Sequence, residues 1–229
     1  IAFLCMAILM TFLPDTGRAK PAKGEKIQLN ARVYILDLFT IVEFLFVITI
    51  TTNIAMHLDG SLAGSSSVSG TVTSCFAAAQ ICIGLVLGLV VKLTRKYTLA
   101  VAMASFAIGA LLIALNPASL PLLGIGAAFC GFSQGMFVPT AATEMTNVVN
   151  PVSAAMASAT LTIAMNLGQF ISPTLVNGMT KGILGEATTT NVYLLGSVCM
   201  AITAVMMVFY RHFTGRRHRR ELRAEGSGR

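Results

Sequence analysis

The chain is organised as long apolar blocks separated by short polar segments. An α-helix rises 1.5 Å per residue, so about 20 apolar residues match the ~30 Å hydrocarbon core of a bilayer. Six blocks approach or exceed this length, over residues 33–56, 71–91, 98–115, 120–142, 153–176 and 191–210. The pattern predicts an all-α membrane protein whose residues 33–215 form a six-transmembrane-helix bundle.

A seventh apolar block, residues 1–13, opens the chain and is too short to span a bilayer. A signal-peptide core is one interpretation, but that core normally follows a basic segment. We therefore expect residues 1–13 to be the end of a truncated transmembrane helix. On that interpretation the chain is the carboxy-terminal part of a longer protein.

Composition supports a membrane protein over a water-soluble one. The sequence is 55% hydrophobic and only 11% charged, with no Trp. Soluble domains carry about 25% charged residues, so this chain would lack the polar surface of a soluble globule. The five cysteines all fall in apolar blocks without CxxC spacing, which is typical of packing residues. No cofactor and no metal site is expected.

Basic residues predict the orientation. Of the 16 Lys and Arg, 15 lie in residues 14–32, in the segment 92–96, or after residue 210, and Lys181 is the exception. With six spans these three segments share one side, and cytoplasmic segments carry the basic excess. We expect a cytoplasmic central linker at 14–32, a basic cytoplasmic tail at 216–229, and location in a plasma (inner) membrane. Anionic lipid explains the basic tail better than nucleic acid does.

Two carboxylates lie in the first full block, without a basic partner. A charge at the bilayer centre costs roughly 2.5–3.5 kcal/mol on insertion scales and marks pathways or proton relays. Asp37, Thr40 and Glu43 form one strip of the helix, which we expect to face a central cavity. Burial would favour the neutral form of Glu43, which suits a proton carrier with Asp37 as its entry-side partner. The alternatives are a structural, hydrogen-bonded Glu43 and an Asp37 that reaches the interface.

Other polar and helix-breaking residues within the blocks are candidates for the solute path. Uncharged amides either bind solutes or join helices by hydrogen bonds, and proline removes a backbone hydrogen bond and kinks a helix. The amide candidates are Gln134, Gln169, Asn53, Gln80 and Asn166. The helix-kink candidates are Pro139, Pro173 and Gly168. Gly84 and Gly88 are small residues that suit close helix packing.

Three motifs in this order resemble the second half of a major facilitator superfamily transporter, over residues 1–215. "GLVVKLTRKY" is similar to the loop motif of that family, with Gly88, Arg95 and Lys96 matching and Lys92 in place of Asp. "GFSQGMFVP" resembles the fourth-helix motif through Gln134 and Gly135, with Gly131 at the Arg position. "NLGQFISPTLVNG" resembles the antiporter motif through Gly168, Pro173 and Gly178.

The resemblance implies a twelve-helix fold in which this chain is one half and an amino-terminal six-helix half is missing. It implies alternating access, with a small-molecule substrate bound between the halves. We expect proton-coupled efflux of small, partly apolar compounds. We also expect a gate formed by Glu144 with Arg95 or Lys96. Proton-coupled uptake of a sugar or organic acid is the alternative, as is a transport-dead six-helix scaffold.

A membrane-embedded enzyme is the rival class. Intramembrane hydrolysis needs a nucleophile with a base, an HExxH pair or two facing aspartates. The chain has no HExxH, and Asp37 has no second Asp within the blocks. The sequence therefore favours a transporter over an enzyme.

Overall fold

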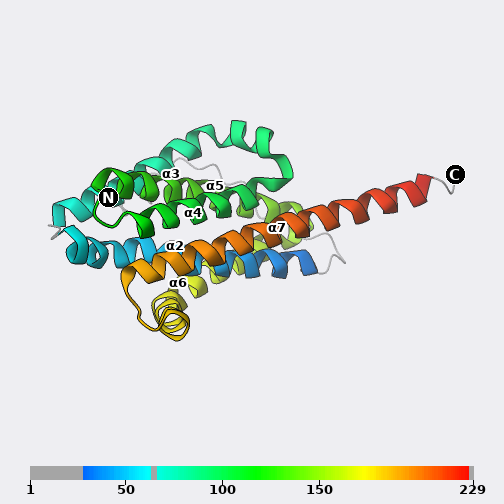
Figure 1. Cartoon of the computed structure of the whole chain (residues 1–229). Coiled ribbons are helices and arrows are strands. Elements are labelled where there is room, and N and C mark those ends of the chain that lie inside the picture. Colours follow the sequence, from blue (N-terminus) through cyan, green and yellow to red (C-terminus); the bar gives the residue numbers. More distant parts are fainter. Residues whose placement is uncertain (1–27, 63–65, 227–229) are drawn as a thin grey trace, which may run out of the picture.

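The structure, a computed structural model, describes residues 28–62 and 66–226. The expected helix end at 1–13 and the expected linker up to residue 27 lie outside the described residues. All regular secondary-structure elements of the described part are helices (Figure 1). Its α-helices are α2 (Ala31–Leu62), α3 (Ser66–Thr94), α4 (Thr98–Leu115), α5 (Leu120–Asn147), α6 (Ala154–Leu184) and α7 (Thr189–Gly226).

Each predicted apolar block coincides with one of these helices, and most of the helices extend past the block at one or both ends. Short 3-10 turns at Arg95–Tyr97 and Pro151–Ser153 precede α4 and α6. Helix α7 continues to Gly226, through most of the segment expected to be the basic tail. Basic residues are good helix formers, so the polar sequence after the apolar block does not end the helix.

Five segments of the described chain are long and apolar enough to cross a membrane: 31–58, 67–115, 120–147, 151–184 and 189–214. The second has 49 residues and contains both α3 and α4. The chain is therefore an integral multi-pass membrane protein. Whether the 49-residue segment crosses the membrane once or twice depends on the directions of α3 and α4.

Helix α3 runs parallel to α5. Gly131 of α5 lies against the backbone of Phe76, and Gly135, one turn later, lies against Gln80. Contacts therefore advance along both helices in the same direction. A Cβ atom on Gly135 would lie 2.7 Å from the carbonyl oxygen of Gln80, so glycine is needed for this close approach.

Helix α4 runs antiparallel to α5. The Ser105 hydroxyl donates to the carbonyl of Phe129 at 2.8 Å, while Gly126 packs against Ile113 farther along α4. Since α3 is parallel to α5, α3 and α4 run in opposite directions, and Figure 1 shows the chain reversing between them. The reversal falls at Arg95, whose φ of 51° is left-handed.

Helix α2 lies between α6 and α7. It is parallel to α6, because Gly168 lies against Ile41, and Ser172, one turn later, donates to the carbonyl of Leu45, one turn after Ile41. It is antiparallel to α7, because Tyr193 near the start of α7 donates to the carbonyl of Thr49 at 3.3 Å, and Phe39 near the start of α2 contacts Tyr210. The start of α2 lies beside the end of α5, where Asn30 donates to the carbonyl of Val148. Sequential helices therefore alternate in direction through the bundle.

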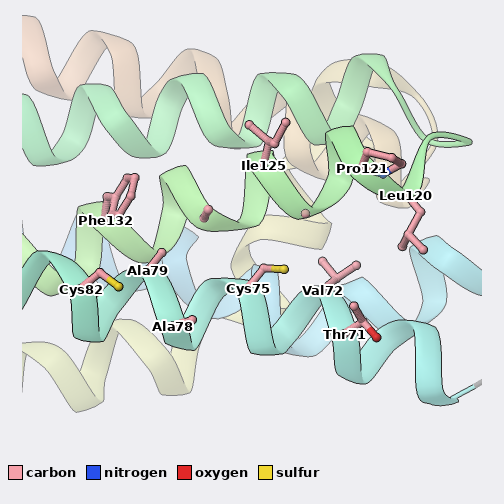
Figure 2. A pocket seen from close by; sticks show the side chains of 12 residues that line it. Thr71, Val72, Cys75, Ala78, Ala79, Cys82, Leu120, Pro121, Ile125 and Phe132 are labelled. Carbon is pink, nitrogen blue, oxygen red and sulfur yellow. The ribbon is translucent and has the colours of Figure 1, made fainter.

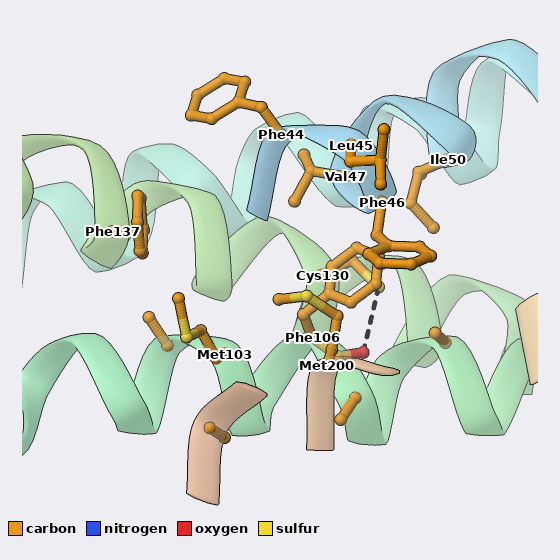
Figure 3. Close-up of a cluster of buried hydrophobic side chains, with 14 of the residues drawn as sticks. Phe44, Leu45, Phe46, Val47, Ile50, Met103, Phe106, Cys130, Phe137 and Met200 are labelled. Carbon is orange, nitrogen blue, oxygen red and sulfur yellow. Dashed lines mark hydrogen bonds between the residues drawn. The ribbon is translucent and has the colours of Figure 1, made fainter. Parts of the chain in front are cut away.

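The core lies where α2, α4, α5 and α7 meet. Figure 3 shows the aromatic and thioether side chains of this cluster, which include Phe46, Phe106, Phe137 and Met200. Cys130 is buried among them, and its thiol points to the carbonyl of Phe106. The four described cysteines are free thiols.

The glycines that pack helices differ from those expected. Gly84 and Gly88 of α3 have open space where a side chain would lie. The close approaches are made instead by glycines on α4, α5 and α6, among them Gly109, Gly135 and Gly168. Spacing of small residues alone does not tell which face of a helix meets its neighbour.

Candidate functional site

Basic residues gather at one end of the bundle. The end of α5 and the starts of α2 and α6 meet there, as shown by the bonds from Gln28 to Ser153 and from Asn30 to the carbonyl of Val148. The ion pair between Glu144 and Arg211 brings α7 to the same end, well before α7 itself ends. The cations of this basic end whose side chains are described are Arg32, Lys92, Arg95, Lys96 and Arg211. Lys181 lies toward the opposite end, near the end of α6.

Glu43 is enclosed in the middle of α2. Its side chain is 0% exposed, and the hydroxyl of Ser133 on α5 donates to Oε1 at 2.6 Å. The second carboxyl oxygen, Oε2, is buried and has no hydrogen-bond partner among the described residues. An unpaired charge in such a setting is costly, so the local structure penalises the ionised form unless the site rearranges or admits water.

The strip expected to face a central cavity turns into the bundle instead. Thr40 and Glu43 are both 0% exposed, and Asp37 is half-buried. The physical reason is that α5 supplies a donor for Glu43, while Thr40 donates to the carbonyl of Leu36 on its own helix. Asp37 lies next to Thr160 of α6, and its Oδ1 is buried without a hydrogen-bond partner among the described residues.

The amide candidates do not form one cluster. Asn166 is exposed, and its Nδ2 donates to the carbonyl of Thr162 on the same helix. The others, Asn53, Gln80, Gln134 and Gln169, are half-buried and lie on α2, α3, α5 and α6. No described hydrogen bond joins any two of these five side chains. They are placed on several helices of the bundle and do not build a single binding centre.

Asn166 and Gln169 belong to a longer feature, which we call the α6 polar stripe. Its first four members recur every three or four residues, which places them on one face of a helix, and the fifth lies about two turns farther along that face. They are exposed except for the half-buried Gln169: Ser158, Thr162, Asn166, Gln169 and Asn177. The period was present in the sequence and would have revealed the stripe. The neighbouring face carries Ile163, Leu167 and Phe170, all of them exposed.

The ion pair of Glu144 differs from the predicted gate pairing in this structure. Glu144 pairs with Arg211 of α7, and not with Arg95 or Lys96. Lys96 instead lies over the ring of Tyr97, 4.9 Å from its centroid. Arg211 is 67 residues from Glu144 in sequence. The antiparallel arrangement of α2 and α7 brings Arg211 to the basic end.

The three helix-kink candidates lie inside continuous helices. Pro139 is in α5 and Pro173 in α6, and each helix extends well past its proline. Gly168 is a packing residue, because a Cβ atom there would lie 2.7 Å from the carbonyl oxygen of Ile41. Ser133 was missed in the sequence, because only the α2–α5 contact identifies it as the partner of Glu43.

A groove of about 650 Å³ opens between α3 and α5 (Figure 2). Its walls are small or apolar, with Thr71, Cys75 and Cys82 as the most polar side chains on one wall and Phe132 on the other. None of the predicted site residues lines it. The groove therefore offers apolar contact area without a charged group.

Comparisons with known proteins give a family. The family model described as Major Facilitator Superfamily matches residues 36–228. A search of curated proteins and a search of solved structures each found no match. The match includes most of the bundle, and the superfamily consists of membrane transporters that move small molecules. The chain belongs to the major facilitator superfamily.

Proposed function

We propose that this bundle is one six-crossing half of a secondary transporter that exports small, partly apolar compounds in exchange for protons. The observation that carries the proposal is Glu43, a carboxyl group held inside a membrane-spanning bundle with one donor, Ser133, and one oxygen without a partner among the described residues. A buried acid with this surrounding is stable when protonated and needs water or a cation when ionised. Coupling requires such a difference between two conformations.

The six crossings are supported by helix direction. Neighbouring helices in the sequence alternate in direction, and the 49-residue apolar segment contains two antiparallel helices. At 1.5 Å per residue, the 18 residues of α4 are about 27 Å long, close to the ~30 Å hydrocarbon core. The basic end is then cytoplasmic, since cytoplasmic loops carry the basic excess.

A second six-helix half is supported by the α6 polar stripe. Amides and hydroxyls exposed at mid-membrane depth are found where they face protein or water and not acyl chains. We propose that the α6 polar stripe lines the solute path between the two halves, with Asn166 and Gln169 as its central amide side chains. The lack of a charged residue in this stripe favours an uncharged or partly apolar solute.

Transport by the Glu43→Gln variant tests the coupling role. A panel of apolar dyes would first be screened for thermal stabilisation of the transporter that contains this bundle, because a ligand that binds the folded state raises its stability. In vesicles with a proton gradient, we expect Glu43→Gln to abolish uphill accumulation of the stabilising dye. Exchange of dye without a gradient should continue, since the amide mimics the protonated form.

Uphill transport by Glu43→Gln at the wild-type rate would contradict the proposal and leave Glu43 as a structural hydrogen-bonding group. The direction of coupling is a separate outcome. Accumulation of dye on the proton-rich side indicates exchange, and accumulation on the opposite side indicates uptake together with protons.

Labelling of introduced cysteines tests the orientation. Ser67, exposed at the start of α3, should react with a membrane-impermeant maleimide added outside the cell when it is replaced by cysteine. A cysteine at Arg32, exposed at the basic end, should react only after the membrane is opened. Reaction of the Arg32 position from outside would reverse the orientation.

A further inference from the structure

Two groups of helices pack more tightly within themselves than against each other. The first group is α2 with α6. Gly168 brings the backbone of α6 against Ile41, where a Cβ atom would lie 2.7 Å from the carbonyl oxygen, and Ser172 donates to the carbonyl of Leu45. Backbones at this distance cannot separate or slide without losing both contacts.

The second group is α5 with α3, α4 and α7, and α7 is held to α4 by the bond from Ser197 to the carbonyl of Ala107. Gly135 brings α5 against the backbone of Gln80 on α3, and Ser105 of α4 donates to the carbonyl of Phe129 on α5. These contacts involve backbone atoms, as in the first group, and close packing of small residues is what joins helices in lipid.

Among the described hydrogen bonds, the one from Ser133 to Glu43 joins α5 to α2. Both side chains are 0% exposed. The bond therefore links the first group to the second through a residue whose charge can change. A hydroxyl donates a shorter and stronger bond to a carboxylate than to a neutral carboxylic acid.

Resting on the role proposed for Glu43, we infer that Ser133 is its positioning residue, and that their hydrogen bond is a proton-controlled contact between the two helix groups. Once water reaches Oε2 and the carboxyl group ionises, the carboxylate holds α2 to α5 through Ser133. Protonation removes the charge, weakens this bond, and lets α2 with α6 shift relative to α5. No group other than Ser133 within the described residues donates to the carboxyl.

The thiol and the phenol near the site are neutral at ordinary pH. Cys130 of α5 lies close enough to Glu43 to interact with it electrostatically, and Tyr193 of α7 lies near Cys130. Free thiols and phenols are uncharged near pH 7. On α2, Asp37 is six residues away, about 9 Å along the axis. Helix α4 has no charged residue. Lys92, Glu144 and Lys181 lie near the ends of α3, α5 and α6, and Arg211 lies near the end of the apolar segment 189–214.

Infrared difference spectroscopy of the purified transporter that contains this bundle, in lipid and titrated with acid and base, tests the inference without a substrate. The carboxyl band that disappears in Glu43→Gln belongs to Glu43. In Ser133→Ala the ionised form loses its only donor among the described residues. We therefore expect the pH at which half of that band has converted to rise by about one to two units. This is the shift expected when a charged group loses a hydrogen bond. Ser133→Thr, which keeps the hydroxyl, should restore the wild-type midpoint.

Ser172→Ala is the matched control. Ser172 is also 0% exposed and loses the same hydroxyl, but its partner is the backbone carbonyl of Leu45. Its midpoint should equal that of the wild type. If Ser133→Ala and Ser172→Ala have the same midpoint while Glu43→Gln abolishes uphill transport, Ser133 has no positioning role and the proposed function stands. If the Glu43 band responds to Na⁺ and not to pH, both proposals are overturned.

The movement has its own measurement. Spin labels at Tyr34 on α2 and Thr143 on α5 occupy exposed positions toward the basic end. In the wild type we expect the distance between the labels to differ between low and high pH, and in Ser133→Ala we expect the low-pH distance throughout. A distance that changes with pH equally in both proteins would show that the Ser133 bond does not control the contact.

Discussion

Helices α2 and α6 pack along each other, yet their polar residues lie in opposite environments. In α2, 61% of an 18-residue apolar stretch is buried within the bundle, and the polar residues Thr40 and Glu43 point inward. In α6 the buried share is 22%, and the α6 polar stripe points outward. Sequence composition alone does not separate these cases, since both helices combine apolar residues with several hydroxyls.

The difference indicates what each surface meets. Inside lipid a polar group needs a partner within the protein, and α2 finds its partners on α5 and on its own backbone. The hydroxyls and amides of α6 bond partly to their own helix, as Thr162 does to Ser158 and Asn166 does to Thr162. Their remaining acceptors are open. This places the polar surface of the bundle on α6 and the polar interior on α2.

The largest expected effect concerns the contact between the two helices. Gly168→Ala would place a methyl group 2.7 Å from the Ile41 carbonyl oxygen, and overpacking of this kind costs about 1–3 kcal/mol. Gly178, on the same helix, has open space around it, so Gly178→Ala is the control. Thermal unfolding in detergent should show a loss for the first variant and none for the second. Equal stability would show that α2 and α6 do not pack as described.

The next effect concerns the two outer faces of α6. A cysteine at Asn166 of the α6 polar stripe should react with a charged maleimide about tenfold faster than one at Phe170, a factor that corresponds to ~1.4 kcal/mol of activation free energy. Both positions are exposed, with Phe170 at 84%, so exposure within the bundle does not explain a difference. Equal rates would place both faces in the same surroundings and remove the solute path from α6.

The positions of the described helices could be predicted, because each hydrophobic block of the sequence coincides with one helix. The site could not, for reasons that differ by residue. The strip containing Glu43 had two possible orientations, and only the position of Ser133 decides between them. The partner of Glu144 is a residue of a distant helix, brought close by helix direction. The α6 polar stripe, in contrast, has a three- or four-residue period that a search of α6 for polar periodicity would have found.

A smaller effect compares hydroxyls on the inner and outer faces of α6. Ser172 is 0% exposed and donates to the Leu45 carbonyl, so Ser172→Ala should destabilise the bundle by about 1 kcal/mol. Ser158 in the α6 polar stripe is exposed, and Ser158→Ala should change stability by less than about 0.5 kcal/mol. Chemical denaturation in mixed micelles measures both. A larger loss for Ser158→Ala would mean that the stripe is covered within this chain.

The smallest effect is expected at the basic end, where α5 and α7 are joined by Glu144 and Arg211. Their side chains are 23% and 20% exposed, so water and salt screen the pair, and an exposed ion pair contributes about 0.2–1 kcal/mol. The charges of this pair are held near water, whereas the carboxyl of Glu43 has no cation among the described residues beside it.

A double-mutant cycle of Glu144→Gln and Arg211→Gln should give a coupling energy of about 0.2–1 kcal/mol. The coupling energy should fall as salt is raised from low to physiological concentration, because the Debye length shortens to about 8 Å.

A cycle of Glu144→Gln with Lys96→Gln is the control and should give no coupling, since Lys96 lies over Tyr97. Coupling to Lys96 instead of Arg211 would restore the gate predicted from the sequence and show that the basic end adopts a second arrangement.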